Sequence, residues 1–267
     1  MLGSKTSRLI GGCIVFALYA FLLAPILVTA VMSFSNDAVL SYPPSTWGVR
    51  WYGALIENGD FGKAFRTSAV IAAAVACLSL LAGVPASYAI ARYRFVGRAS
   101  LFALFTAPLL LPSIVLGVGM LLVFVRLHLT ATYSGLILGH LVVTFPYVLR
   151  IVTTSFASLP PDLEDAARTL GGSPWKVFSR ITLPLMAPGL VASVSLAFLI
   201  SFDEVVISLF LVGPRLTTLP VQVFNYVYYR VDPQIAALSV VLIVLSVLIV
   251  LSIERTVGVL RALGRQY

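Results

Sequence analysis

The chain has 267 residues, of which 60% are hydrophobic and only 10% are charged, and its mean hydropathy is +1.02. Soluble domains carry about one quarter charged residues, so this composition excludes a water-soluble protein with an ordinary core. The formal net charge of +8 is better explained by basic residues flanking membrane spans than by nucleic-acid binding.

Six segments are long and apolar enough to cross a bilayer, which takes roughly 20 residues of helix. They are Leu9–Met32, Ser68–Ala91, Leu101–Val125, Tyr133–Ala157, Ala187–Val212 and Gln234–Ile253. They leave no room for a large soluble domain, so we predict an all-α integral membrane protein with six transmembrane helices. The first segment follows Lys5 and Arg8 as a signal peptide would. Its apolar run exceeds the 7–15 residues of a signal core, so we interpret it as an uncleaved span.

Basic residues are distributed unevenly between the segments that connect the spans. With the N-terminus in the cytoplasm, the inner segments hold twelve of the 18 Lys and Arg residues and the outer segments hold six. Cytoplasmic loops carry the excess of positive charge in membrane proteins. We therefore predict a multi-pass protein with both termini in the cytoplasm.

The sequence offers no catalytic or metal-binding motif. Cys-x-x-Cys, His-x-x-x-His and Gly-x-Ser-x-Gly are absent, and His128 and His140 are isolated. There is also no Gly-x-x-x-x-Gly-Lys-[Ser/Thr] phosphate loop. We expect no enzyme activity, metal or cofactor in this chain, and any ATP and Mg²⁺ would be bound by another subunit.

One inner loop, residues 158–185, is polar and carries helix start and stop signals. Pro160 and Pro161 precede acidic residues that suit a first helical turn. Gly171 and Gly172 end this helix, and Ser173 and Pro174 begin a second one. We predict that Leu183-Pro184 breaks the second helix just before the fifth span. A surface helix that only orders a long loop would show the same signals.

The spacing in this loop resembles that of the permease subunits of type I ABC importers. Their pattern is Glu-Ala-Ala, three residues, Gly, nine residues, Ile, one residue, Leu-Pro. This chain has Asp165-Ala166-Ala167, then Gly171, then Ile181 and Leu183-Pro184 at the same spacing, with Asp165 in place of Glu. In that family the first helix couples to the ATPase subunit. The resemblance implies that role for the residues Glu164, Asp165, Ala166, Ala167, Arg168 and Gly171.

Further stretches extend the resemblance over about residues 65–253 of a single transmembrane domain, residues 1–267. "ASYAIARYRF", "SFDEVVISLF" and "TLPVQVFNYVYYRVDPQIAALSVVLIVLS" resemble the spermidine/putrescine branch of these permeases. This implies import of a small polyamine-like cation across a bacterial inner membrane. The implied partners are a second permease, different in preference to identical, two ATPase subunits and an extracytoplasmic binding protein.

Two adjacent acids, Asp203 and Glu204, interrupt the fifth apolar segment. A charge at the centre of a lone lipid-facing helix costs about 2.5–3.5 kcal/mol, so such residues face protein or a water-filled path. Neighbours on a helix point about 100° apart. Glu204 shares its face with small and polar residues, whereas Asp203 has apolar neighbours at the same offsets. We predict that Glu204 faces the substrate pathway and that Asp203 lies on the flank of this pathway. The small and polar stripe that shares the face of Glu204 contains Ser193, Ala197, Ser201 and Ser208.

A cationic substrate accounts for acids in this segment, since a fixed carboxylate stabilises a desolvated amine. Tyr226 and Tyr229 lie in the aromatic run "FNYVYYR" and could offer cation–π contacts at the outer mouth, or form an ordinary interfacial belt. The acids could instead form a structural ion pair with a partner subunit. Three rival functions remain: a permease for another small organic or inorganic ion, a proton-coupled secondary transporter, and a membrane-embedded enzyme.

Overall fold

The structure, a computed structural model, describes residues 5–230 and 232–264. Within these ranges it is helical, with no β-strand. Contacts between Cα atoms divide the chain into two compact units, which are described separately. Unit 1 is Met1–Gly59 with Val223–Leu248, and unit 2 is Asp60–Gln222 with Ile249–Tyr267.

Unit 1 contains helices from both ends of the chain. They are α1 (Lys5–Met32), α2 (Arg50–Glu57), most of α12 (Leu219–Tyr229) and the first half of α13 (Gln234–Gly264). Between α1 and α2 lies a loop that Asp37 organises. Its carboxylate accepts the Ser41 and Thr46 hydroxyls at 2.9 and 2.7 Å and the backbone N–H groups of Ser45 and Thr46 at 2.8 and 3.1 Å.

These four bonds hold the pKa of Asp37 down to about 2, because the Thr46 hydroxyl and the Ser45 amide both stabilise the ionised form. Hydrogen bonds to the Asp37 carboxylate thus hold the conformation of this loop between α1 and α2.

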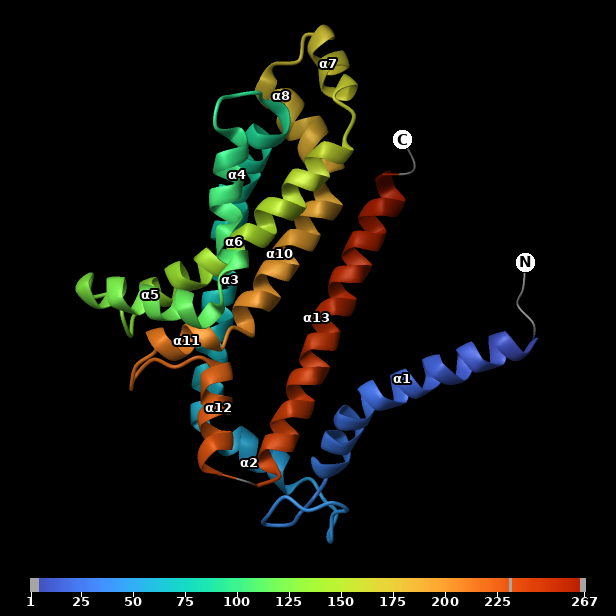
Figure 1. The fold of residues 1–267 in the computed structure, drawn as a ribbon, viewed down its shortest axis with the longest axis vertical. Coiled ribbons are helices and arrows are strands. Elements are labelled where there is room, and N and C mark those ends of the chain that lie inside the picture. The colour runs from blue at the N-terminus through green and yellow to red at the C-terminus, as the bar shows by residue number, and fades with distance from the viewer. Residues whose placement is uncertain (1–4, 231, 265–267) are drawn as a thin grey trace. The chain divides into compact units, whose positions relative to one another are not determined.

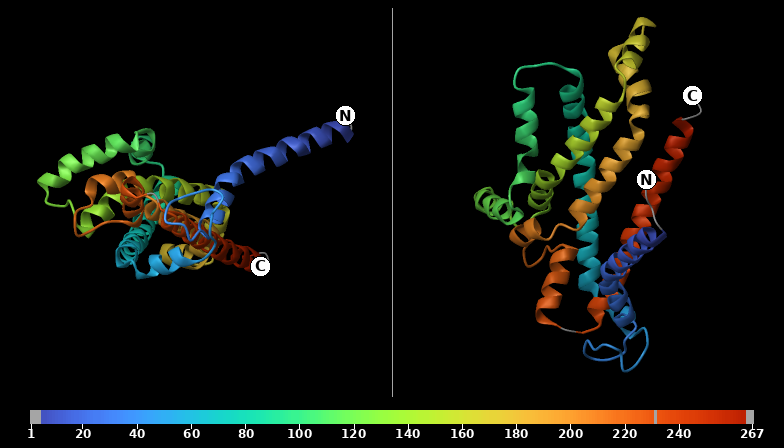
Figure 2. Two further views of the ribbon diagram at one scale, coloured as in Figure 1. Left: turned by 90° about the horizontal axis from the view of Figure 1, so that it is seen from below. Right: turned by 45° about the vertical axis from the view of Figure 1, so that its right-hand side comes forward.

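Unit 2 is a bundle with its connections. Its helices are α3 (Gly59–Arg92), α4 (Arg98–Thr106), η1 (Ala107–Leu110), α5 (Ser113–Arg126), α6 (Tyr133–Ser158), α7 (Asp162–Thr169), α8 (Pro174–Val177), η2 (Phe178–Thr182), α9 (Leu183–Leu185), α10 (Ala187–Phe202) and α11 (Val206–Leu211). Figures 1 and 2 show α3, α6 and α10 running alongside one another, with α7 beyond their ends.

All six predicted apolar segments lie on helices, but two of them are interrupted. Among the described residues, Ile10–Met32, Gly59–Arg92 and Tyr133–Ser158 are long and apolar enough to span a membrane. The third predicted segment bends by 105° between Arg98–Leu110 and Ser113–Arg126. Leu111 has extended backbone angles because the ring of Pro112 disfavours the helical region for the residue before it. The fifth segment breaks after Phe202.

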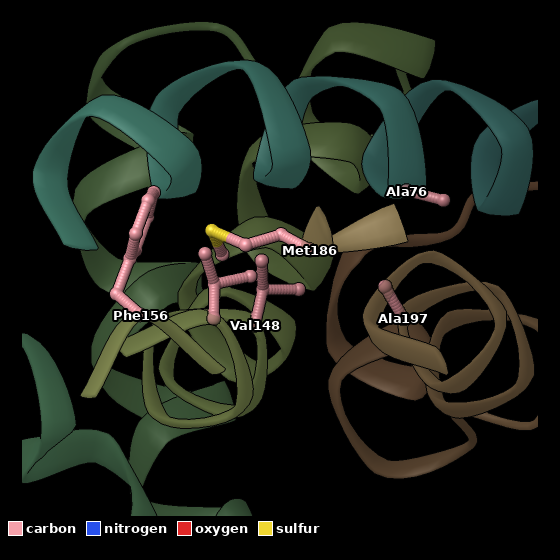
Figure 3. Packing of buried hydrophobic residues seen from close by; sticks show 6 residues of the cluster. Ala76, Val148, Phe156, Met186 and Ala197 are labelled. Atoms are coloured by element: carbon pink, nitrogen blue, oxygen red, sulfur yellow. The ribbon is translucent and has the colours of Figure 1, made fainter. Parts of the chain in front are cut away.

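The core of unit 2 forms where α3, α6 and α10 meet. Ala76, Val148, Phe156, Met186 and Ala197 are buried together there, as Figure 3 shows. Small residues allow the backbones of membrane helices to approach closely: a Cβ at Gly83 of α3 would lie 2.8 Å from a Val148 methyl group. The Ser87 hydroxyl also donates to the Leu149 carbonyl at 3.2 Å. The bundle therefore combines close packing with an interhelical hydrogen bond.

Candidate functional site

The predicted helix of the 158–185 loop is present as α7, and glycine ends it as expected. Gly171 has φ +83°, in the left-handed region that glycine adopts at no steric cost. Its N–H donates to the Arg168 carbonyl at 3.0 Å, and the Gly172 N–H donates to the Ala167 carbonyl at 3.0 Å. This pair of bonds is the Schellman motif, which fixes the direction in which the chain leaves α7.

One face of α7 is apolar and exposed. Leu163, Ala166 and Leu170 share it because they are three and four residues apart, and the Leu170 side chain is 89% exposed. Trp175, on α8, is 72% exposed. Asp165 is exposed beside this face, and Ala167 is half-buried. We call Leu163, Ala166, Leu170 and Trp175 the apolar face of the loop.

Glu164 lies on the opposite side of α7 and is buried. Its Oε1 atom accepts from the Arg92 Nε at 3.1 Å and from the Thr182 hydroxyl at 3.2 Å. Its Oε2 atom accepts from the Tyr88 hydroxyl at 3.4 Å and lies 3.9 Å from the Arg168 guanidinium. Arg168, 46% exposed, also pairs with Asp165 at 3.4 Å. The residues predicted for coupling thus divide between an exposed group and a buried carboxylate.

The second helix of the loop differs in detail from the prediction. Ser173 precedes α8 with extended backbone angles, but its side chain makes no capping hydrogen bond. Leu183-Pro184 does not end the helix: α8, η2 and α9 run together, and the bend of 70° comes at Met186. Pro184 has no N–H to give to the helix, and η2, the turn before it, is π-helical. The wider π-helical turn of η2 accommodates the loss of the hydrogen bond that Pro184 cannot make, so the helix continues past Leu183-Pro184.

A break between α10 and α11 holds the two acids. The chain leaves helical geometry at residues 203–205, so the prediction of one unbroken helix over Ala187–Val212 is wrong. The Glu204 carboxylate accepts the N–H of Ile207 at 3.0 Å, in the first turn of α11. This bond satisfies an N–H that has no partner within the helix. Glu204, which is half-buried, therefore helps to start the second helix.

Asp203 is the more exposed of the two acids. Its backbone N–H closes α10 on the Leu199 carbonyl at 3.1 Å, and its side chain is exposed. The structure thus leaves the Asp203 carboxylate open and engages that of Glu204, which is the reverse of the accessibility expected from an unbroken helix.

His140 on α6 bridges the break. Its Nδ1 atom lies 2.9 Å from the Ser201 hydroxyl on α10, and its Nε2 atom lies 2.9 Å from the Ser208 hydroxyl on α11. A neutral imidazole donates with one nitrogen and accepts with the other, so both contacts can be hydrogen bonds. All three side chains are buried. We call His140, Ser201 and Ser208 the histidine bridge.

The small and polar stripe predicted on the fifth span packs inside the chain. Ser193, Ala197, Ser201 and Ser208 are all buried, and the last two belong to the histidine bridge. Their place on a substrate pathway stays a prediction. No spacing pattern marks His140 in the sequence, because its partners are 61 and 68 residues away.

The two predicted tyrosines belong to α12 in unit 1 and differ in exposure. The Tyr226 hydroxyl donates to Asp232 Oδ2 at 2.7 Å, and Gln234 Oε1 lies 2.7 Å from it. Burial, and then the bond to Asp232, raise the pKa of Tyr226 to about 12. The Arg230 guanidinium lies 5.7 Å from its ring centroid, within cation–π range. Tyr229 is exposed and packs edge-on against Tyr228.

Comparison with known proteins places this arrangement in a family. The family model described as "Binding-protein-dependent transport system inner membrane component" matches residues 82–261. This stretch contains the 158–185 loop, the break and the histidine bridge. The chain belongs to this family. The type I ABC importer permease predicted from the loop spacing is confirmed, and the protein is a multi-pass membrane permease.

Curated relatives of this permease carry names from polyamine transport. The putrescine transport system permease protein PotI of Escherichia coli K12 is 34% identical over 232 residues, covering 84% of this chain and 82% of that protein. The spermidine/putrescine transport system permease proteins PotC of E. coli K12 and Haemophilus influenzae are 30% and 33% identical. Alignment with them covers 92% and 89% of this chain and 92% of each relative.

Solved structures agree on the permease fold. A chain of a bacterial ABC transporter that imports the acidic polysaccharide alginate superposes with a TM-score of 0.66 at 17% identity, covering 100% of this chain and 99% of that chain. A chain of the inward-facing MetNI methionine ABC transporter gives a TM-score of 0.62 at 18% identity, covering 75% and 95%.

Proposed function

We propose that this permease imports a small polyamine-like cation in an ATP-driven complex. The observation that carries the proposal is the exposed Asp203 carboxylate at a break in a membrane helix. Intramembrane acids are costly and usually face a water-filled path, and transporters often bind substrate where a helix is discontinuous. The 30–34% identical relatives named for putrescine and spermidine supply the substrate class.

In this proposal the two acids exchange the roles expected from an unbroken helix. Asp203 contacts the cation, and Glu204 holds the start of α11 through its bond to the Ile207 N–H. Ser201 and Ser208 support the break from inside. Tyr226 and Tyr229 belong to the outer mouth, where the exposed ring of Tyr229 is the one available for a cation–π contact.

The apolar face of the loop supports the proposed partners. Leu163, Leu170 and Trp175 are exposed within the polar loop of residues 158–185. Lipid is not expected to cover a polar loop, whereas a partner ATPase would cover these side chains. With both termini in the cytoplasm, as the basic residues favour, this loop also lies in the cytoplasm. The complex then has a second, different permease and two ATPase subunits, which bind ATP and Mg²⁺. A binding protein delivers the substrate from outside.

The experiment measures ATP-driven putrescine and spermidine uptake by the reconstituted complex, with Asp203→Asn and Glu204→Gln compared in parallel. Hydrogen bonds to charged groups contribute about 1.5–3 kcal/mol, and about 1.4 kcal/mol is tenfold. Asp203→Asn should therefore reduce uptake at sub-saturating polyamine by about 10- to 100-fold. Glu204→Gln keeps an oxygen that can accept the Ile207 N–H, so it should keep most of the uptake.

Three results would contradict the proposal. If Asp203→Asn transports normally while Glu204→Gln does not, Glu204 is the residue that meets the cation. If both variants transport normally, the acids serve assembly. Wild-type uptake that follows a proton gradient and ignores ATP would identify a secondary transporter.

A further inference from the structure

A buried polar cluster joins α7 to the bundle. Glu164 lies at its centre, and its partners outside α7 come from two other elements of unit 2. Tyr88 and Arg92 lie in the last turns of α3, and Thr182 closes η2. The Arg92 guanidinium also donates to the Leu159 carbonyl, at the end of α6, at 3.2 Å. The single carboxylate of Glu164 and its arginine therefore connect α3, α6, α7 and η2.

The cluster is withdrawn from water. The side chains of Arg92 and Glu164 are 13% and 7% exposed. Removing two charges from water is costly, and the attraction between them offsets this cost only with good geometry and further hydrogen bonds. The Tyr88 and Thr182 hydroxyls and the Leu159 carbonyl supply those bonds. Tyr88 is itself fixed between the rings of Phe156 and Phe178, at centroid distances of 5.3 Å each.

Few other contacts hold α7 in place. The helix is eight residues long, and Glu164 is its only buried residue. Leu163, which is 45% exposed, lines a pocket with Leu159, Ile181 and Leu185. Prolines precede it, and the Gly171-Gly172 cap follows it. A push on α7 therefore reaches the bundle mainly through Glu164, to α3 by way of Arg92 and to the segment leading into α10 by way of Thr182.

We propose that the Arg92–Glu164 pair is the joint through which α7 moves the transmembrane helices. Glu164 is then a positioning residue that does not touch the ATPase. The inference rests on the proposed function, in which the apolar face of the loop docks on an ATPase. It separates two neighbours on α7: Asp165, whose side chain is 67% exposed, belongs to the docking surface, and Glu164 belongs to the joint.

The test reconstitutes the complex in proteoliposomes and measures polyamine uptake and ATP hydrolysis in the same sample, per assembled complex. Glu164→Gln and Arg92→Gln each remove one charge of the pair. We expect both to lower the ratio of uptake to hydrolysis by about 5-fold or more, the lower limit of typical coupling between distant sites. The exchanged pair Arg92→Glu with Glu164→Arg should recover part of that ratio, which a loss of folding would not.

Milder variants keep the test informative if the charge variants assemble poorly. Thr182→Val and Tyr88→Phe each remove one hydroxyl from Glu164 and should lower the ratio in the same direction. The matched control is Ser179→Ala, in the same turn as Thr182. The Ser179 hydroxyl donates to the Trp175 carbonyl of its own helix at 2.7 Å. It should leave the ratio unchanged.

Two outcomes would contradict the proposal that the Arg92–Glu164 pair is the joint. If Glu164→Gln weakens ATPase binding as Asp165→Asn does and leaves the ratio intact, Glu164 is a docking residue. If the variants reduce only the assembled fraction, with a wild-type ratio per complex, the pair serves stability alone. Failure of the proposed function looks different, because then the wild-type complex itself shows no ATP-driven polyamine uptake.

Discussion

Replacing His140 by Leu tests whether the histidine bridge holds the break between α10 and α11. Leucine approximates the volume of the imidazole and removes both hydrogen bonds, to Ser201 and Ser208 at 2.9 Å each. In a water-soluble core, each unpaired hydroxyl would cost about 1–3 kcal/mol. In a membrane, the inserted unfolded chain finds other partners, and interhelical bonds average about 0.6 kcal/mol and reach about 1.7 kcal/mol.

The membrane values apply here because α6 and α10 lie in apolar segments. Two bonds then give a loss of about 1–3 kcal/mol. A chain of this size loses about 2–4 °C of melting temperature per kcal/mol, so His140→Leu should melt roughly 2–12 °C below wild type. Thermal unfolding of the purified complex in nanodiscs measures this. Transport should fall as well, because the break that presents Asp203 loses its support.

A matched control and a double-mutant cycle make this test specific. Ser195→Ala removes a hydroxyl that bonds the Val191 carbonyl of its own helix at 2.7 Å, so its effect should be small. His140→Leu combined with Ser201→Ala should cost less than the sum of the single variants, because both remove the same bond. The bridge does not stabilise the break if His140→Leu and Ser195→Ala have the same melting temperature. The same conclusion follows if the losses caused by His140→Leu and Ser201→Ala are additive.

Three further changes address the glycine cap of α7, a close contact between α6 and α11, and the loop between α1 and α2. Gly171→Val should place a β-branched residue at φ +83° at a cost of about 1–2 kcal/mol; coupled hydrolysis should fall while membrane insertion, measured by fractionation, persists. Gly139→Ala would put a Cβ 2.5 Å from the Leu211 side chain and should cost about 1–3 kcal/mol by overpacking, measured as a lower melting temperature. The lowered pKa of Asp37, about 2 against its usual 3.8, stabilises the folded loop above pH 4, and this stabilisation is lost as the pH falls toward 2. Fluorescence of Trp51, whose indole N–H donates to the Asp37 carbonyl at 3.1 Å, should stay constant from pH 7 to 5 and change below 4, with no such change in Asp37→Asn.

Much of the fold was predictable because its signals are local. Apolar length places the helices without reference to the rest of the chain. The α7 helix and its glycine cap also follow from neighbouring residues, and the left-handed Gly171 confirms that part of the interpretation.

The site was less predictable because helical phase depends on continuity. Counting by threes and fours from Glu204 assumed an unbroken helix, and the break at residues 203–205 changes the direction of every residue near it. The partners of His140, and the α3 partners of Glu164, lie 61 to 76 residues away along the chain. One sequence alone carries no signal for contacts at that separation, so the histidine bridge and the buried carboxylate become visible only in three dimensions.

The exposed apolar face of the loop also has a consequence for the life of the protein in the cell. Leu163, Leu170 and Trp175 are exposed, and in the proposed complex they remain in water until an ATPase subunit covers them. Unfolded or exposed apolar chains are what chaperones and quality-control proteases act on. A permease synthesised in excess of its ATPase is thus marked for removal by the surface through which it would have worked. The amount of permease in the membrane should follow the supply of ATPase subunits, so the stoichiometry of the importer is enforced after translation.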